Sequence, residues 1–120
     1  PRVEFAVTGH VRREVAGGVD HELQVGVPED LAFFRGHFEG WPVLPAVAQV
    51  AALVIPQVAA LHPELAAPRR AVRLKFSRPI APGDALVLRL EVRGGKVRFT
   101  LARAGEVVSG GALEYEVPGA

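Results

Sequence analysis

His37 is the residue of this sequence best placed to do acid–base chemistry. It lies in a loop-like stretch, residues 33–45, that is rich in glycine, proline and aromatic side chains. An imidazole titrates near neutral pH, so it can take a proton from a weakly acidic carbon and return it later. We expect the other three histidines to be solvated surface residues: His10, His21 and His62.

A long apolar run follows this loop and predicts a helix over residues 45–61. From residue 46 onward its only strongly polar side chains are Gln49 and Gln57. A helix that is apolar on nearly all sides is expected to be buried. Pro45 suits the first turn, because its missing N–H would be unpaired there anyway. Pro56 predicts a kink or a break, because it removes one helical hydrogen bond and crowds the preceding turn.

The start of this helix is a second feature that could do chemistry. The N–H groups of Ala46 and Val47 have no acceptor within the helix, and the positive end of the helix dipole lies there. Such a turn can stabilise a developing oxyanion. Capping by the loop or by water would satisfy the same groups equally well. Gln49, one turn further on, could line a site or satisfy a buried backbone group.

Alternating apolar and polar residues predict strands on both sides of the helix. Before it we expect two short strands joined by a turn at Gly17-Gly18, over residues 11–15 and 21–27. After it, four strand-like runs are separated by turn residues: 71–78, 85–93, 96–103 and 106–117. Strands with one apolar face must cover something apolar, and the helix is the only candidate. The sequence therefore predicts an α+β fold, with an antiparallel sheet wrapped around one central helix.

Composition limits the kind of protein this chain can be. The 120 residues, 49% of them hydrophobic, suit a single domain over residues 1–120. Fourteen basic and thirteen acidic residues give a net charge of +1, which is not the balance of a nucleic-acid-binding protein. There is no cysteine for disulfides, and the apolar run is short for a membrane span. These features predict a cytoplasmic protein that binds neither nucleic acid nor membrane.

Two motifs resemble a known family. The first, Gly36-His37-Phe38-x-Gly40-x-Pro42-Val43-Leu44-Pro45-x-Val47, resembles the active-site segment of the hot-dog-fold β-hydroxyacyl-ACP dehydratases. Within that superfamily, the run from Leu44 to Gln49 is most similar to the aryl-polyene-type (ApeI-like) dehydratases. The second, Phe76-x-Arg78-Pro79-Ile80-x-Pro82-Gly83-Asp84, matches at the corresponding later position. The resemblance covers residues 33 to about 115 and implies a hot-dog fold.

The resemblance also implies a function and its residues. The chain is expected to be a 3-hydroxyacyl-ACP dehydratase, a lyase of fatty-acid-like or polyene biosynthesis, with His37 as general base and the helix start as oxyanion site. No cofactor or metal is expected, because the substrate is a thioester on the phosphopantetheine of an acyl-carrier protein. Further residues are expected to line the site: Phe38, Gly40, Trp41, Pro45, Gln49 and Ala51.

A basic cluster is expected to dock the acidic carrier protein that dehydratases of this family engage. It consists of Arg69, Arg70, Arg73, Lys75 and Arg78. The alternative is an ordinary solvated face of the sheet. Docking steered by such a patch would be sensitive to salt.

The sequence departs from the family at Ala51. The family carries a carboxylate at this helix position, which protonates the departing hydroxyl, whereas residues 41–63 contain no Asp or Glu. Three remedies remain open. His37 could serve as both base and acid, Glu39 or Asp30 could reach in from the loop, or a second chain could supply the acid. In this family the histidine and the carboxylate of one site come from different subunits of a dimer.

Three functions therefore remain open. The first is the dehydratase itself. The second is an acyl thioesterase, which also generally needs a carboxylate on this helix. The third is a non-catalytic acyl-binding subunit, or a heterodimer partner that lends His37 to an acid-bearing paralogue. Ala51 supports the third, as does Ala46, which replaces a glycine of the family. A homodimer or heterodimer is expected in every case, because unpaired sheet edges tend to find partners.

Overall fold

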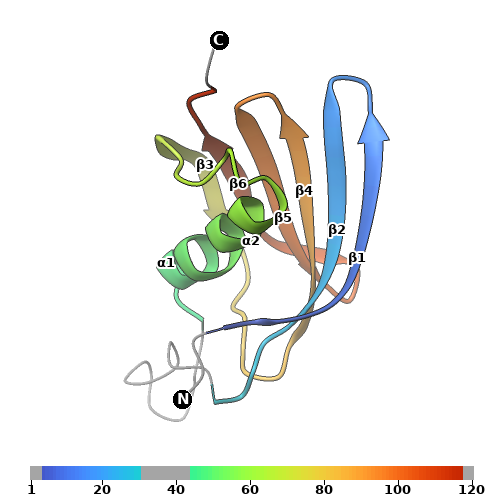
Figure 1. Ribbon diagram of the computed structural model, residues 1–120. Coiled ribbons are helices and arrows are strands. Elements are labelled where there is room, and N and C mark those ends of the chain that lie inside the picture. The colour runs from blue at the N-terminus through green and yellow to red at the C-terminus, as the bar shows by residue number, and fades with distance from the viewer. Residues whose placement is uncertain (1–3, 31–43, 118–120) are drawn as a thin grey trace.

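The computed structural model describes residues 4–30 and 44–117, which form an antiparallel sheet with one helix packed on one of its faces (Figure 1). The sheet has six strands in the order β1-β2-β4-β5-β6-β3. Their bounds are β1 (Ala6–Val15), β2 (Gly18–Gly26), β3 (Arg70–Phe76), β4 (Ala85–Arg93), β5 (Lys96–Arg103) and β6 (Glu106–Glu114). The predicted α+β architecture is confirmed.

Glycines make the hairpin turns where the sequence places them. Gly17, between β1 and β2, has a φ of 80° and Gly105, between β5 and β6, also has a φ of 80°. Only glycine adopts such angles without strain. The outer boundaries differ from the prediction, because β1 begins at Ala6 rather than at residue 11 and β6 ends at Glu114.

One layer of apolar side chains joins the helix to the sheet. The helix contributes Leu53, Val54 and Val58, all fully buried. The facing strands contribute alternate residues with an exposed fraction of 1% or less: Leu86, Leu88, Leu90, Val97, Phe99 and Leu101. The alternate residues of the strands and the buried residues of the helix therefore pack into one core.

The helix is continuous over residues 46–61 but changes its hydrogen-bond pattern along the way. It comprises α1 (Ala46–Ala48), a π-helical segment η2 (Gln49–Val54) and α2 (Ile55–Leu61). In the π-helical segment the Ile55 N–H reaches back five residues, to the Val50 carbonyl. Pro56 then falls in the first turn of α2, where a missing N–H costs nothing. Of the predicted kink or break at Pro56, the break is absent, because one wider turn just before the proline accommodates it.

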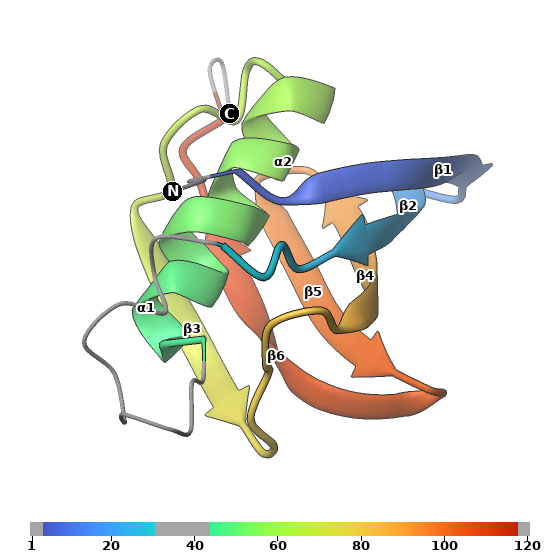
Figure 2. The ribbon, with the colours of Figure 1, turned by 90° about the horizontal axis from the view of Figure 1, so that it is seen from below.

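The sheet covers only part of the helix (Figure 2). Ala46 and Ala51 are exposed, and the side chain of Val47 is 73% exposed. We refer to Ala46, Val47 and Ala51 as the open stripe. The expectation that this helix is buried on nearly all sides is wrong for the single chain, since the open stripe remains in solvent.

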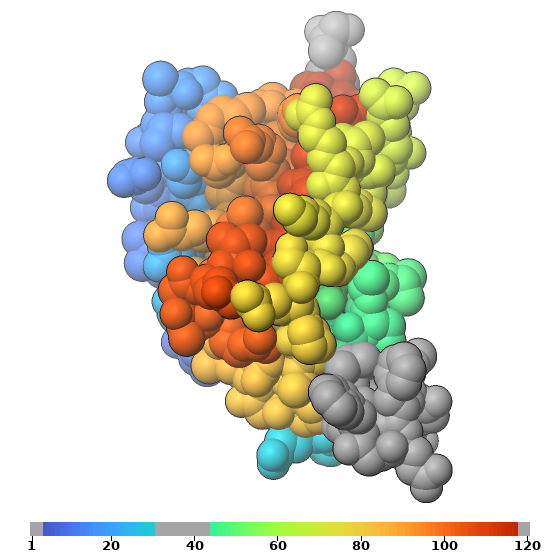
Figure 3. Space-filling model, turned by 180° about the vertical axis from the view of Figure 1, so that it is seen from behind, coloured from blue at the N-terminus to red at the C-terminus, as the bar shows by residue number. Residues whose placement is uncertain are grey.

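Strand β3 forms one edge of the sheet and is irregular. Its register against β6 shifts between Val72 and Lys75, and Arg73 has a φ of 53°. This bulge interrupts the predicted alternation, and Leu74 remains 42% exposed. A Cβ on Gly111 would lie 2.6 Å from Leu74 Cδ2, so the glycine allows Leu74 to approach β6 closely. Figure 3 shows the atoms of β3, in yellow, beside the green start of the helix.

Candidate active site

The chain changes from extended to helical at Pro45. This residue has φ −60° and ψ 149°, and its carbonyl accepts hydrogen bonds from the N–H groups of Ala48 and Gln49, both at 3.1 Å. The preceding residue, Leu44, is buried and donates its N–H to the Ile80 carbonyl at 2.7 Å. The helix start is therefore fixed by a residue that lies 36 positions later in the chain than Leu44.

The first turn of the helix carries N–H groups that the helix itself leaves unpaired. The N–H groups of Ala46 and Val47 have no acceptor within the helix, and no side chain caps this turn in the described part of the chain. Both residues are exposed. The turn can therefore donate two hydrogen bonds to an oxygen that gains negative charge. Their oxyanion role stays a prediction.

Gln49 and Ala51 lie on different sides of the helix. Gln49 is only 3% exposed, and its Nε2 donates to the Leu44 carbonyl at 3.3 Å. Its Oε1 is buried without a hydrogen-bond partner among the described residues. Ala51 is exposed. The amide of Gln49 therefore braces the helix start from inside and cannot replace a carboxylate at position 51.

Several predicted site residues lie outside the described residues. These are His37, Phe38, Gly40 and Trp41, together with the loop acid Glu39. Asp30 is described and exposed. Of the predicted site, the structure thus describes the part that the helix provides. In the described ranges, no group of three or more His, Cys, Asp or Glu side chains could hold a metal ion.

The second sequence motif, from Phe76 to Asp84, contains a loop that holds the helix start. We refer to this loop as the braced loop. Asp84 Oδ2 accepts hydrogen bonds from the Ala81 N–H at 2.9 Å and from Arg103 Nη1 at 2.7 Å. The same Arg103 nitrogen donates to the Pro79 carbonyl at 2.8 Å. Between these contacts lies Ile80, fully buried, whose carbonyl holds Leu44. Sequence reasoning used this motif only to identify the family and missed Arg103, to which no local pattern points.

Most of the predicted docking cluster is neutralised by acidic residues near the end of the chain or on β6. Three of its members form ion pairs: Arg69 with Glu116, Arg70 with Glu114, and Arg78 with Glu106. The hydrogen bond from Arg70 lowers the pKa of Glu114, and nearby positive charges act in the same direction. Arg73 and Lys75 have no ion pair within the described ranges. Carrier-protein docking stays a prediction that now depends on these two residues.

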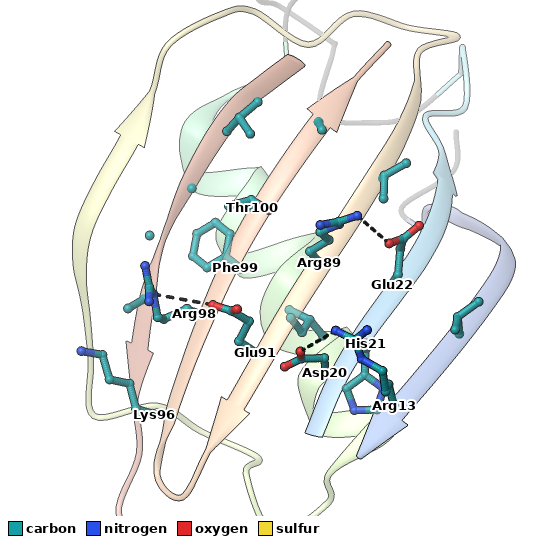
Figure 4. Close-up of a pocket in the computed structure, with 18 of the residues that line it drawn as sticks. Arg13, Asp20, His21, Glu22, Arg89, Glu91, Lys96, Arg98, Phe99 and Thr100 are labelled. Carbon is teal, nitrogen blue, oxygen red and sulfur yellow. Dashed lines mark ion pairs between the residues drawn. The ribbon is translucent and has the colours of Figure 1, made fainter. Parts of the chain in front are cut away.

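A shallow hollow on the outer face of the sheet is a separate feature (Figure 4). Its floor carries ion pairs between neighbouring strands: Glu22 with Arg89, Glu91 with Arg98, and Asp20 with Arg13. No residue of the helix lines it, and the helix lies behind the sheet in this view. The hollow is therefore not the acyl site expected at the helix start.

The expectation that three histidines are solvated surface residues is wrong for the central one. His21 is 3% exposed and lies between His10 and His62, with a ring nitrogen 2.8 Å from a nitrogen of each neighbour. Burial, with smaller effects of the same sign from both neighbours, lowers the pKa of His21 to about 4. No contact of these histidines with the helix start is seen in the described residues.

Comparison with known structures defines the class of protein. An uncharacterised protein from Erwinia carotovora subsp. atroseptica superimposes with a TM-score of 0.81 at 25% identity, over 92% of this chain and 94% of that one. A dehydratase heterocomplex, ApeI:P from Xenorhabdus doucetiae, superimposes with a TM-score of 0.75 at 23% identity, over 92% and 96%. The predicted hot-dog fold is confirmed.

Sequence comparison identifies the family within that fold. The family model described as ApeI-like, ApeI dehydratase, matches residues 13–112, so the chain belongs to the ApeI-like dehydratases. It is also 36% identical over 78 residues to the 3-hydroxyacyl-acyl-carrier-protein dehydratase FabZ of Pelotomaculum thermopropionicum, and 37% identical over 78 residues to that of Desulforamulus reducens. These alignments cover 60% of this chain and 54% of each relative, so the chain spans about half the length of the curated relatives it matches. No helix among the described residues is long and apolar enough to cross a membrane.

Substitution of Asp84 tests whether the braced loop holds the helix start. Asp84→Ala removes the acceptor of one backbone N–H and the partner of Arg103, so we expect the free energy of unfolding to fall by about 1–3 kcal/mol. Urea denaturation measures this loss. Glu106→Ala is the matched control, because it removes an exposed pair with Arg78, whose side chains are 60% and 57% exposed, and such pairs contribute about 0–1 kcal/mol. Equal losses in the two variants would contradict a bracing role for Asp84.

Proposed function

We propose that this chain takes part in the dehydration of 3-hydroxyacyl thioesters carried on an acyl-carrier protein, in fatty-acid-like or polyene biosynthesis. Its membership of the ApeI-like dehydratases supports the reaction class. The observation that carries the proposal is the uncapped and exposed first turn of the helix, held in place through Leu44 and the braced loop. A turn so fixed can meet a thioester oxygen without rearranging.

In the proposed reaction His37 removes a proton from the carbon next to the thioester carbonyl. Negative charge then develops on the carbonyl oxygen, where the N–H groups of Ala46 and Val47 stabilise it. The electron pair forms the carbon–carbon double bond as the C3–O bond breaks. The departing hydroxyl takes a proton and leaves as water, so that a 3-hydroxyacyl group becomes a 2-enoyl group.

The acid that protonates the departing hydroxyl is proposed to come from a second chain. The position that would carry it on this helix is Ala51, which lies in the open stripe and faces away from the core. Edge strand β3 exposes two more apolar side chains, Leu74 at 42% and Phe76 at 37%. Together these surfaces offer an apolar face for a partner. A heterodimer with an acid-bearing paralogue would complete the site, and the similar structure from Xenorhabdus doucetiae is itself a dehydratase heterocomplex.

A second candidate function is a non-catalytic subunit that binds acyl groups or assembles with a catalytic partner. The observation that favours it is the lack of any acidic residue from position 41 to position 63. Under this alternative the helix start contributes shape and hydrogen bonds but no turnover. The two candidates differ in whether His37 matters for activity.

Substitution of His37 tests the base. Loss of a general base typically slows turnover by about 10²–10⁴-fold, and we expect a loss in this range for His37→Ala in the hydration of an enoyl-ACP. In the wild type the rate should rise with pH through the pKa of a histidine, about 6.5, because only the neutral ring accepts a proton. The variant should lack this rise. An unchanged rate, in a variant whose circular dichroism matches the wild type, would favour the non-catalytic subunit.

Substitution of Ala51 tests the missing acid. We expect Ala51→Glu to raise the rate of the homodimer assayed without an acid-bearing paralogue, because each chain then supplies a carboxylate to the site of the other. In the dimer the open stripe is covered, so the free energy of unfolding should fall if the new carboxylate is left unpaired there.

Ala60→Glu is the matched control, since Ala60 is another exposed alanine of the same helix but lies near its far end. The control should leave the rate unchanged. Equal rates in both variants and the wild type would contradict the proposal that position 51 is where the site lacks its acid.

A further inference from the structure

Three imidazole rings form a hydrogen-bonded row beside the end of the helix that is remote from the proposed site. His10 Nε2 lies 2.8 Å from His21 Nδ1, and His21 Nε2 lies 2.8 Å from His62 Nε2. The ring centroids are 5.0 Å apart in both contacts. Both nitrogens of the central ring are therefore engaged, one on each side. We refer to His10, His21 and His62 as the histidine row.

The histidine row joins three parts of the fold. His10 belongs to edge strand β1 and His21 to the neighbouring strand β2. His62 directly follows α2, and its N–H donates to the Val58 carbonyl at 2.7 Å in the last turn. The row thus fastens the C-terminal end of the helix to the outer strands of the sheet.

A count of protons shows how the row responds to acid. Each of its two hydrogen bonds needs one proton between two facing nitrogens. A neutral ring carries one N–H, so three neutral rings can satisfy both bonds if their N–H groups point the same way along the row. One added proton is also accommodated on an outer ring, because that ring then donates to a neutral His21, whose own N–H points to the other neighbour. A second added proton sets two N–H groups against each other, which breaks a bond and brings two cationic rings together.

The surroundings of the row limit how many protons it holds. On β1, Arg12 disfavours a charge on His21, and Asp20 on β2 favours it more weakly. Asp20 is itself hydrogen-bonded to Arg93 of β4. At the helix end, Glu64 Oε2 lies 3.8 Å from His62 Nδ1, with a side chain that is 57% exposed. The burial that lowers the pKa of His21 to about 4 works in the same direction as the proton count.

We propose that the histidine row is a pH-responsive fastening, which holds the helix end to the sheet with at most one added proton and opens when it binds a second. The sign of its effect on stability follows from linkage. In the unfolded chain all three imidazoles bind protons below a pKa of about 6.5, whereas the folded row holds at most one. Unfolding therefore takes up about two protons, and stability falls as pH decreases through this range.

The test is the pH dependence of the free energy of unfolding, measured by urea denaturation from about pH 8 to about pH 5.5. Its slope gives the number of protons taken up, and we expect about two for the wild type at the acidic end. His10→Gln and His62→Gln each place an amide where a ring nitrogen bonds, which keeps the contact but removes one titrating group. Each variant should take up about one proton.

His37→Gln is the matched control, because it removes the one histidine of the sequence outside the row and should leave the slope at about two protons. Hydrogen exchange of the amide of residue 62, bonded to the Val58 carbonyl, reports opening directly: its protection factor should fall below about pH 6 in the wild type, and fall less in His62→Gln. A wild-type slope near zero, or slopes in both row variants equal to that of the wild type, would overturn the proposal.

Discussion

The packing of one face of a short apolar helix against the sheet is the interaction on which the rest of the structure depends. Leu53, Val54 and Val58 are fully buried against alternate residues of β4 and β5. Each fully buried side chain of this size contributes about 1.5–3 kcal/mol, so few such contacts determine where the helix lies. The open stripe, near the start of the same helix, is also apolar but has no cover in the single chain. One constraint therefore produces both the core and the surface that we propose a partner occupies.

The two ends of the helix are held in different ways. At the start, Leu44 is hydrogen-bonded to buried Ile80, in the loop that Asp84 and Arg103 brace. This arrangement leaves the first N–H groups free to face a substrate. At the far end, His62 joins a row of rings whose hydrogen bonds depend on pH. The proposed chemistry thus lies at the end fixed by Leu44 and the braced loop, and the proposed pH response lies at the other.

Much of the architecture could be predicted from local sequence, because it depends on patterns that repeat over a few residues. The helix at residues 45–61, the glycine turns and the alternation in β4 and β5 are of this kind, and each is found where it was expected. The bulge at Arg73 and the π-helical turn before Pro56 were missed. Both arise from fitting neighbouring elements together, for which a single segment carries no signal.

The site shows the same difference between features set by local sequence and features set by long-range packing. The N–H groups that the helix leaves unpaired at Ala46 and Val47 follow from helix geometry and were expected, with capping by the loop or by water left open. The exposure of Ala51 emerged only from the packing of the whole helix. The ion pairs that neutralise most of the basic cluster and the contact between His21 and His62 join residues far apart in sequence. Residue types alone suggested isolated surface groups at these positions, because pairing across a sheet depends on the register between its strands.

The central claim is that a second chain covers the open stripe and edge strand β3. Sedimentation velocity of the purified protein at micromolar concentration tests it most directly. The account predicts a species of at least dimer mass, because the apolar side chains of Val47, Leu74 and Phe76 would otherwise stay in water. A stable monomer under these conditions would contradict a self-association through this face. A monomer that also fails to associate with an acid-bearing member of the same family would contradict the shared site altogether.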